Sequence, residues 1–238
     1  MPITRCVSFP VALGASLSLI LLWQALAQET KPAGYVSSAR CRSCHAPQAA
    51  AYAKSRHGRV RAKSSSDPLS NFKRSTGYDP ATGKFAEDGI GCEACHGPGG
   101  NHAGKAGIVS FGALKADRAA MVCGQCHSRG KAKDGRAFPA GYRAGADLNL
   151  FWVAERGAAV DEEYNQWLDS KHARKGVWCG DCHVVHSADP RKPLTPSDPT
   201  RFCGSCHEGA RNLKEHAPHA GPKDTCLTCH MPDGSHRF

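Results

Sequence analysis

The sequence predicts a single domain over residues 28–238, of mostly irregular backbone and short α-helices, with little or no β-sheet. Three observations lead to this fold class. Leu, Ile, Val and Phe supply only 26 of the 211 residues from Gln28 onward, too few for an interior built from side chains alone. The cysteines recur in one short motif, and connections rich in Ser, Gly and Lys separate its copies. Such a chain either stays disordered or takes its apolar interior from a bound group.

The first residues predict a secretory signal peptide over residues 1–27. Arg5 supplies a positive charge, Val11–Trp23 is apolar, and Ala25-Leu26-Ala27 matches an A-x-A cleavage site. We expect cleavage before Gln28 and therefore a periplasmic protein. An uncleaved anchor is the alternative, but about 16 apolar residues fall short of the roughly 20 that span a bilayer. We therefore expect no stable membrane anchor.

Every cysteine after Cys6 lies in a C-x-x-C-H motif, which is the signature for covalent attachment of haem c. The two thiols add to the vinyl groups of one porphyrin edge, and the histidine becomes the proximal ligand of the iron. Six motifs predict six haems c. The cofactor-binding residues are then Cys41, Cys44, Cys92, Cys95, Cys123, Cys126, Cys179, Cys182, Cys203, Cys206, Cys226 and Cys229. The proximal ligands are His45, His96, His127, His183, His207 and His230.

Other uses of paired cysteines fit less well. Zinc knuckles do not need a histidine at one fixed offset every time. Disulfides within each motif would close six tiny loops and constrain the unfolded chain very little. A thioredoxin-like role needs one motif on a βαβ scaffold.

Seven further histidines are candidates for the distal ligands, and internal repetition supports four of them. His57 and His172 end two copies of the pattern aromatic-x-x-Ser-basic-His, in stretches whose composition favours helix. His102 and His236 end two copies of C-H-x-P-x-G-x-H. In that pattern the proline and glycine stop any helix after the proximal ligand and turn the chain. Each of these four histidines is predicted to be a distal ligand.

The remaining three histidines lie near the last three motifs. His186 follows His183 by three residues, one helical turn away on the same face, so we expect it to bind a neighbouring haem. Either His216 or His219 supplies the last ligand, and the sequence leaves both open. Few methionines remain as alternative ligands, so bis-histidine ligation is predicted, with low reduction potentials.

Two long connections separate the motifs. Residues 58–89 are rich in Ser, Lys, Gly and Asp and are predicted to form a surface loop. The second connection contains a predicted helix over Asp161–His172, with Glu162 and Glu163 in its first turn.

At this point the chain resembles a known family, the periplasmic multihaem cytochromes c. The stretches that resemble decahaem cytochromes of the MtrA/DmsE type are Gly91–His102 with Ser110–Gly112, His57 after the first motif, and Cys179–His186. The stretches similar to another branch, which includes the tetrahaem cytochromes of ammonia oxidisers, are Cys123–Arg129, Pro139–Tyr142 and Cys229–Pro232. The resemblance covers about residues 38–238 and implies a haem-cored electron carrier.

Two departures limit what the resemblance implies. Decahaem conduits are longer, so six haems would hardly cross an outer membrane through a porin unaided. The usual C-H-x-P-H ending has Asp233 in place of its histidine, so this ligand must come from elsewhere, and His236 is the candidate.

The chain is basic, with a formal net charge of +10. Nucleic acid is excluded as a partner because no recognition motif or aromatic-basic interleaving accompanies the charge. Six haems would bring about twelve propionate charges and leave the mature protein near about +3 oxidised and about −3 reduced. The basic run Arg56, Arg59, Arg61 and Lys63 is then either a solvated face that also pairs propionates or a docking site for an acidic partner.

The predicted function is periplasmic electron transfer between redox partner proteins. The partners would be other cytochromes, a quinol dehydrogenase, and a terminal reductase or outer-membrane acceptor. The rival is a multihaem oxidoreductase acting on a small nitrogen or sulfur compound, which needs an open iron position. All six proximal residues are histidine, and the distal candidates suffice to close every haem, so a carrier is favoured over an enzyme. A storage or scaffolding cytochrome is a third interpretation.

The first prediction concerns stoichiometry. The intact mass of the exported protein should exceed the mass of residues 28–238 by six haem masses, because each motif attaches one haem through two thioether bonds. Mass spectrometry of the purified protein measures this. A mass equal to the bare chain, or to the chain plus zinc, would contradict it.

Overall fold

The computed structural model describes residues 34–61, 65–104, 106–157, 159, 162–187 and 199–238. The predicted signal peptide, Lys63 of the basic run and Asp161 at the start of the expected helix lie outside these residues. No helix within them is both long enough and apolar enough to cross a bilayer.

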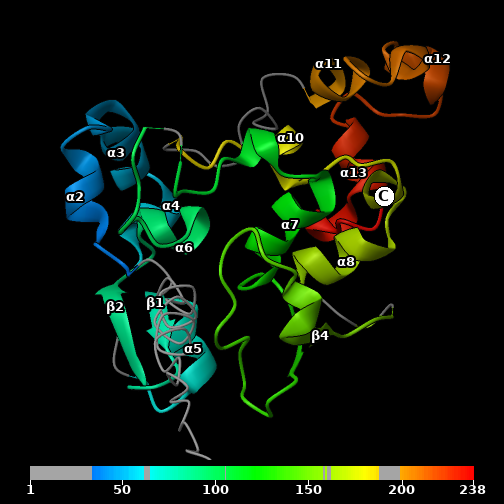
Figure 1. The fold of residues 1–238 in the computed structure, drawn as a ribbon. Helices are drawn as coiled ribbons and strands as arrows, with labels where there is room; N and C mark the ends of the chain where they lie inside the picture. Colours follow the sequence, from blue (N-terminus) through cyan, green and yellow to red (C-terminus); the bar gives the residue numbers. More distant parts are fainter. Residues whose placement is uncertain (1–33, 62–64, 105, 158, 160–161, 188–198) are drawn as a thin grey trace, which may run out of the picture. The chain divides into compact units, whose positions relative to one another are not determined.

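Short helices and irregular segments make up most of the described chain, with two small antiparallel sheets, which confirms the predicted fold class (Figure 1). The α-helices are α2 (Ser38–Arg42), α3 (Ala46–Ala53), α4 (Arg56–Arg59), α5 (Pro68–Phe72), α6 (Cys92–His96), α7 (Ala116–Gly124), α8 (Glu163–Asp169), α9 (Lys171–Arg174), α10 (Cys179–Cys182), α11 (Pro199–Gly204), α12 (Leu213–His216) and α13 (Cys226–His230). The strands are β1 (Ser75–Asp79), β2 (Lys84–Asp88), β3 (Gly130–Ala132) and β4 (Trp152–Ala154). Four single 3₁₀ turns are η1 (Phe111–Ala113), η2 (Leu148–Leu150), η3 (Glu208–Ala210) and η4 (Pro232–Gly234).

The prediction of a surface loop over residues 58–89 is wrong over residues 68–88, which form α5 and the β1–β2 hairpin. The turn is fixed by Asp79, whose carboxylate accepts bonds from the Ala81 N–H and the Thr82 hydroxyl at 2.9 and 2.8 Å. Gly83 completes it at a φ of +69°, which glycine adopts at little cost. The aromatic ring of Tyr78 packs at 5.2 Å from that of Phe85 on the opposite strand. The average composition of residues 58–89 did not reveal this turn or the pairing of the two strands.

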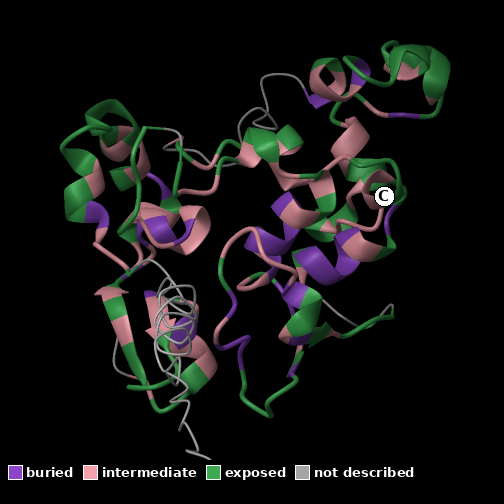
Figure 2. Cartoon of the chain, viewed as in Figure 1, coloured by how far each residue is buried: buried purple, intermediate pink, exposed green. Residues whose placement is uncertain are grey.

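A small side-chain core lies within the middle of the chain, and Figure 2 shows its buried residues on α7 and α8. It comprises Ala120, Met121, Ala132, Tyr142, Leu148, Trp152, Tyr164 and Trp167. Strands β3 and β4 pair antiparallel beside it, with Ala132 opposite Trp152. A second, smaller cluster is formed by Phe72, Phe138 and Ala140, so the few buried apolar side chains gather in two places among the described residues.

The single helix predicted over Asp161–His172 is divided into α8 and α9 at Ser170. Ser170 has extended backbone angles, and its hydroxyl accepts a bond from the Ala173 N–H at 3.1 Å, so it caps the new helix. Ser55 caps α4 in the same way, through the Gly58 N–H at 3.0 Å. Both serines are buried. The repeated aromatic-x-x-Ser-basic-His pattern is therefore a helix break that presents its histidine in the first turn of the next helix.

Two carboxylates, Glu93 of α6 and the half-buried Glu87 of β2, hold the start of α2 and the residues before it. Glu93 is 2% exposed, and its carboxylate accepts bonds from the N–H groups of Val36, Ser37 and Gly99 at distances of 2.7 to 3.1 Å. Glu87 accepts from the N–H and hydroxyl of Ser38 at 3.0 and 2.9 Å. These acceptors satisfy N–H groups that no helix or strand pairs.

The Glu93 contacts predict a large loss of stability in Glu93→Ala. The substitution leaves three N–H groups without their acceptor, which should cost about 3 kcal/mol of unfolding free energy. Denaturant unfolding of the haem-loaded protein, followed by far-UV circular dichroism, measures the change. Glu215→Ala, at an exposed position on α12, is the control and should stay near the wild type. Equal stability of the two variants would contradict the role of Glu93.

Candidate functional site

Each C-x-x-C-H motif begins in a short helical turn, so its two cysteines lie on one side of the chain. The turn continues to the histidine through a backbone bond to the carbonyl of the first cysteine. Its N···O distances are 2.9 Å for His45 to Cys41, 3.0 Å for His127 to Cys123, 2.8 Å for His183 to Cys179 and 2.9 Å for His207 to Cys203. The motif therefore presents two thiols and an imidazole in a fixed local order.

The motifs meet in three neighbouring pairs through their first cysteines. Burial and a hydrogen-bonding contact with Cys92 raise the pKa of Cys41 to about 11. The same kind of contact with Cys179 raises the pKa of the Cys123 thiol. Burial and contact with Cys226 raise the pKa of Cys203. The corresponding helices α2 and α6, α7 and α10, and α11 and α13 are in contact. Motifs one and two, three and four, and five and six are thus adjacent.

Each motif histidine faces a second histidine from outside the motifs. The ring-centroid distances are 6.3 Å for His45 and His102, 6.1 Å for His96 and His186, 5.9 Å for His127 and His57, 6.1 Å for His183 and His236, 5.9 Å for His207 and His172, and 6.1 Å for His230 and His216. Within the described residues His219 is exposed and faces no other ring. The structure therefore brings His216, and not His219, to a motif histidine.

These separations fit an iron held between two imidazoles. A metal–nitrogen bond of about 2 Å plus a ring radius of about 1.2 Å, taken on both sides, gives centroids about 6 Å apart. Two thiols lie beside each such pair, as covalent attachment of a porphyrin requires. The donor set and the spacing agree with haem c at the motifs.

The His186 pairing does not arise from the helical turn that the sequence predicted. Helix α10 ends at Cys182, and His183 has extended backbone angles of −116° and 135°. His186 instead leaves the motif and stacks on His96 with an interplanar angle of 15°. The Asp181 side chain accepts from the Trp178 N–H at 2.9 Å and caps the start of α10.

Several of these imidazoles donate Nδ1–H to an acceptor, which leaves Nε2 free for a metal. His96 donates to the Val109 carbonyl at 2.9 Å, and His102 donates to the Ala106 carbonyl at 3.0 Å. His127 donates to the Glu163 carboxylate at 3.3 Å. This bond lowers the pKa of Glu163 to about 2.

Burial lowers the pKa of His57, His186 and His236, with a smaller contribution from the facing histidine in each case. All three imidazoles are therefore neutral at pH 7, and the neutral form is the one that binds a metal. The Nδ1 atoms of His57 and His236 are buried and have no hydrogen-bond partner among the described residues.

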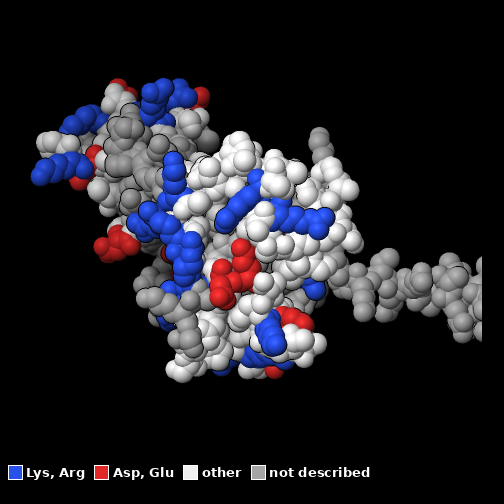
Figure 3. All heavy atoms as spheres, turned by 90° about the vertical axis from the view of Figure 1, so that its left-hand side faces the viewer, with Lys and Arg blue, Asp and Glu red and all other residues white. Residues whose placement is uncertain are grey.

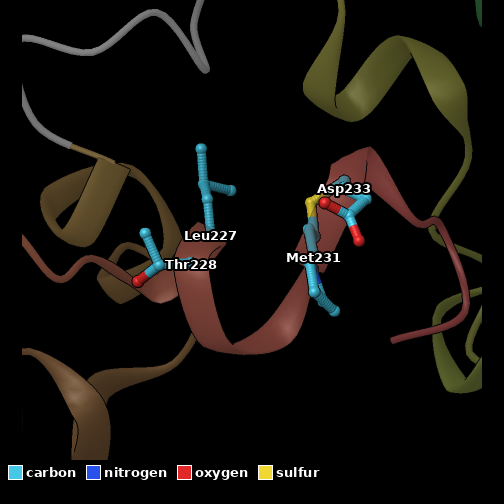
Figure 4. A pocket seen from close by; sticks show the side chains of 5 residues that line it. Leu227, Thr228, Met231 and Asp233 are labelled. Carbon is cyan, nitrogen blue, oxygen red and sulfur yellow. The ribbon is translucent and has the colours of Figure 1, made fainter.

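A hollow of about 410 Å³ lies beside the last motif. Leu227 and Thr228 line one side of it, and Met231 and Asp233 line the other (Figure 4). Asp233, which stands where the resemblance predicted a histidine, has a φ of +54° and starts a left-handed turn. This turn directs the chain away from the hollow and toward His183, where His236 lies.

The sequence interpretation missed the contacts that α8 makes with the ligand segments. It gave Glu163 only a role at the helix start, and it assigned no role to Asn165 or Gln166. Asn165 is 1% exposed and exchanges two bonds of 2.8 Å with the backbone of Arg129. These partners are 36 residues apart, so no local pattern signals the contact.

Comparisons with known proteins agree with this geometry. Residues 171–212 match the family model described as a doubled CXXCH motif. The chain is 30% identical over 156 residues to the multiheme cytochrome MtrA of Shewanella baltica, covering 62% of this chain and 37% of the relative. It thus spans little more than a third of that protein's length. The fold resembles the outer cell wall cytochrome OcwA, with a TM-score of 0.62, 18% identity, and coverage of 85% of this chain and 79% of that one.

The motifs, the fold and these matches define a class of protein, the c-type cytochromes with several haems. All three matches support a multihaem cytochrome c.

The histidine pairs predict which substitutions open a haem. His236→Ala should convert one haem from low-spin to high-spin, because it removes the imidazole that faces His183, and the reduced protein should then bind carbon monoxide. His216→Ala should do the same at His230. EPR of the oxidised protein and carbon monoxide difference spectra measure both effects.

His219→Ala is the matched control and should leave all haems low-spin. If His236→Ala also keeps every haem low-spin, the pairing of His236 with His183 is wrong. A high-spin signal in His219→Ala would instead show that His219 is the ligand.

Proposed function

We propose that this protein is a periplasmic cytochrome with six bis-histidine haems c that transfers electrons between redox partner proteins. The six imidazole pairs carry the proposal, since each motif histidine has a second imidazole at the distance that closes an iron on both sides. Export is supported by the predicted signal peptide. The structural neighbour OcwA is named as an outer cell wall protein, which agrees with a position outside the cytoplasm.

At every motif, residues of the same kinds would hold the haem. Two cysteines attach the porphyrin edge, the motif histidine binds one face of the iron, and the facing histidine binds the other. Haem c supplies a one-electron ferric–ferrous couple when bound. The assigned distal ligands, in motif order, are His102, His186, His57, His236, His172 and His216.

The distal ligands also connect the three motif pairs into a series. His57 follows the first motif and faces His127 of the third, while His186 follows the fourth and faces His96 of the second. His172 and His236 connect the middle pair to the last pair in the same reciprocal way. This cross-connection supports a continuous chain of attachment sites from the first pair to the third.

A carrier is favoured over an oxidoreductase because substrate chemistry at a haem needs an open position. Every motif histidine here is matched by an imidazole within 6.3 Å, which leaves no motif unpaired.

An exposed basic surface surrounds the first motif and supports docking of an acidic partner. We call it the basic surface. It consists of Arg40 and Arg42 of α2, Lys54 directly after α3, Arg56 and Arg59 of α4, and Arg61 shortly after α4. No Asp or Glu occurs between residues 38 and 61. Cys44 and His45 are exposed beside it. Figure 3 shows Lys and Arg side chains along the face that carries these helices. Such a surface raises the encounter rate with a negatively charged protein.

The proposed function predicts fast, salt-dependent electron transfer to an acidic acceptor. The reduced protein, mixed with a blue-copper protein that has an acidic face, should be reoxidised in a second-order reaction that slows as ionic strength rises. Arg40→Glu with Lys54→Glu should lower the rate about tenfold at low salt, because steering is lost. Stopped-flow absorbance in the haem bands measures it.

Lys131→Glu with Lys133→Glu, two exposed positions near β3, is the matched charge-reversal control. An equal loss of rate in both double variants would remove the basic surface as the docking site. Reoxidation by nitrite or tetrathionate that outpaces the protein acceptor would favour the oxidoreductase.

A further inference from the structure

Helix α8 carries no candidate ligand, yet consecutive residues of it contact ligand segments of two neighbouring motifs. The Glu163 carboxylate lies 3.3 Å from His127 Nδ1, and the Tyr164 N–H donates to the His127 carbonyl at 3.0 Å. The Gln166 side-chain oxygen accepts a bond from the His236 N–H at 2.8 Å. The helix therefore holds a ligand of the third motif and a ligand of the fourth.

The Glu163 side chain is 54% exposed, but buried contacts of the next two residues hold its backbone beside His127. The Asn165 side chain accepts a bond from the Arg129 N–H and donates one to the Arg129 carbonyl. It donates a further bond to the Glu155 carbonyl at 2.7 Å. The ring of Tyr164 packs against Gly124, where an added Cβ would lie 2.7 Å from the ring. These contacts hold the first turn of α8 against residues 124–129.

The acceptor at His127 is the carboxylate of an acidic side chain. His96, His102 and His172 instead have main-chain oxygens, of Val109, Ala106 and Phe238, as their Nδ1 partners. A carboxylate acceptor draws the Nδ1 proton and makes the imidazole a stronger donor to its metal. Stronger donation stabilises ferric iron over ferrous iron and lowers the potential of the one-electron couple.

We propose that Glu163 is a positioning residue that lowers the reduction potential of the haem attached at Cys123 and Cys126, acting through His127. This inference rests on the proposed ligation of that haem by His57 and His127. The step concerned is the uptake of one electron by the ferric iron, with the electron supplied by an electrode in the test. The third motif belongs to the middle pair. Glu163 therefore sets a difference in reduction potential between this haem and its neighbours in the series.

The test is Glu163→Gln in the full, haem-loaded protein. Glutamine retains the side-chain size but removes the carboxylate, so reduction of one haem should become about tenfold more favourable, which is about 59 mV for a one-electron couple. The other haems should keep their potentials. Optical titration in a thin-layer electrode cell measures all components.

Glu162→Gln is the matched control, because Glu162 is the adjacent residue and pairs with Lys73 at 3.5 Å instead of with a ligand. It removes the same charge without removing the bond to His127, so it should give a clearly smaller shift. Glu163→Asp shortens the side chain but keeps the charge, and it should shift the same haem in the same direction as Glu163→Gln. Equal shifts in Glu163→Gln and Glu162→Gln, or none in either, would overturn the inference.

Haem mass and EPR spin state, recorded on the same samples, distinguish a failure of the proposed ligation from a failure of the role proposed for Glu163. If the wild type lacks a low-spin haem at this motif, the proposed ligation fails. If every haem is low-spin and Glu163→Gln leaves all potentials unchanged, only the role of Glu163 fails. If Glu163→Gln does not accumulate in folded form, Glu163→Asp against Glu162→Gln decides in the same way.

Discussion

Two imidazole rings about 6 Å apart are the arrangement that recurs at every motif, and the path of the chain follows from it. A motif can supply only one side of an iron, because the two cysteines and the proximal histidine occupy one short turn. The second ring must come from another part of the chain. His57 faces His127 across 70 positions, and His236 faces His183 across 53. The connections between motifs therefore act as spacers whose length is set by where each ring must lie.

Short helices suit this task better than long ones. A helix that ends and restarts at a capped serine can turn a histidine out of line with the residues before it, as at Ser55 and Ser170. The positive φ angles at Asp233 and Gly234 redirect the chain between His230 and His236. Each break costs regular backbone hydrogen bonds, and side-chain oxygens replace them. The breaks in the helices thus bring these histidines opposite the motif histidines, and side-chain caps stabilise each break.

The apolar side chains are concentrated where the ligand segments need a rigid support. The cluster around Met121, Tyr142, Trp152 and Trp167 includes the buried faces of α7 and α8, which carry Cys123 of the third motif and the contacts to His127 and His236. Elsewhere buried polar groups such as Glu93 and Thr76 tie segments together. Outside this cluster, a smaller one of Phe72, Phe138 and Ala140 packs against Cys126 of the third motif. Among the described residues these are the two clusters of buried apolar side chains, which agrees with attached porphyrins supplying much of the remaining apolar surface.

The sequence by itself determined the class of fold, and it predicted the haem attachment cysteines and the pool of candidate histidine ligands. It could do so because attachment chemistry demands a fixed local spacing, and local spacing is written in the sequence. The β1–β2 hairpin and the break at Ser170 were also local, yet composition hid them behind the averages for their segments. Only the tertiary structure decided which histidine faces which motif, why His216 rather than His219 is placed to serve, and that Glu163 reaches His127. Those contacts join residues tens of positions apart, and their partners are chosen by how the packed segments meet in space.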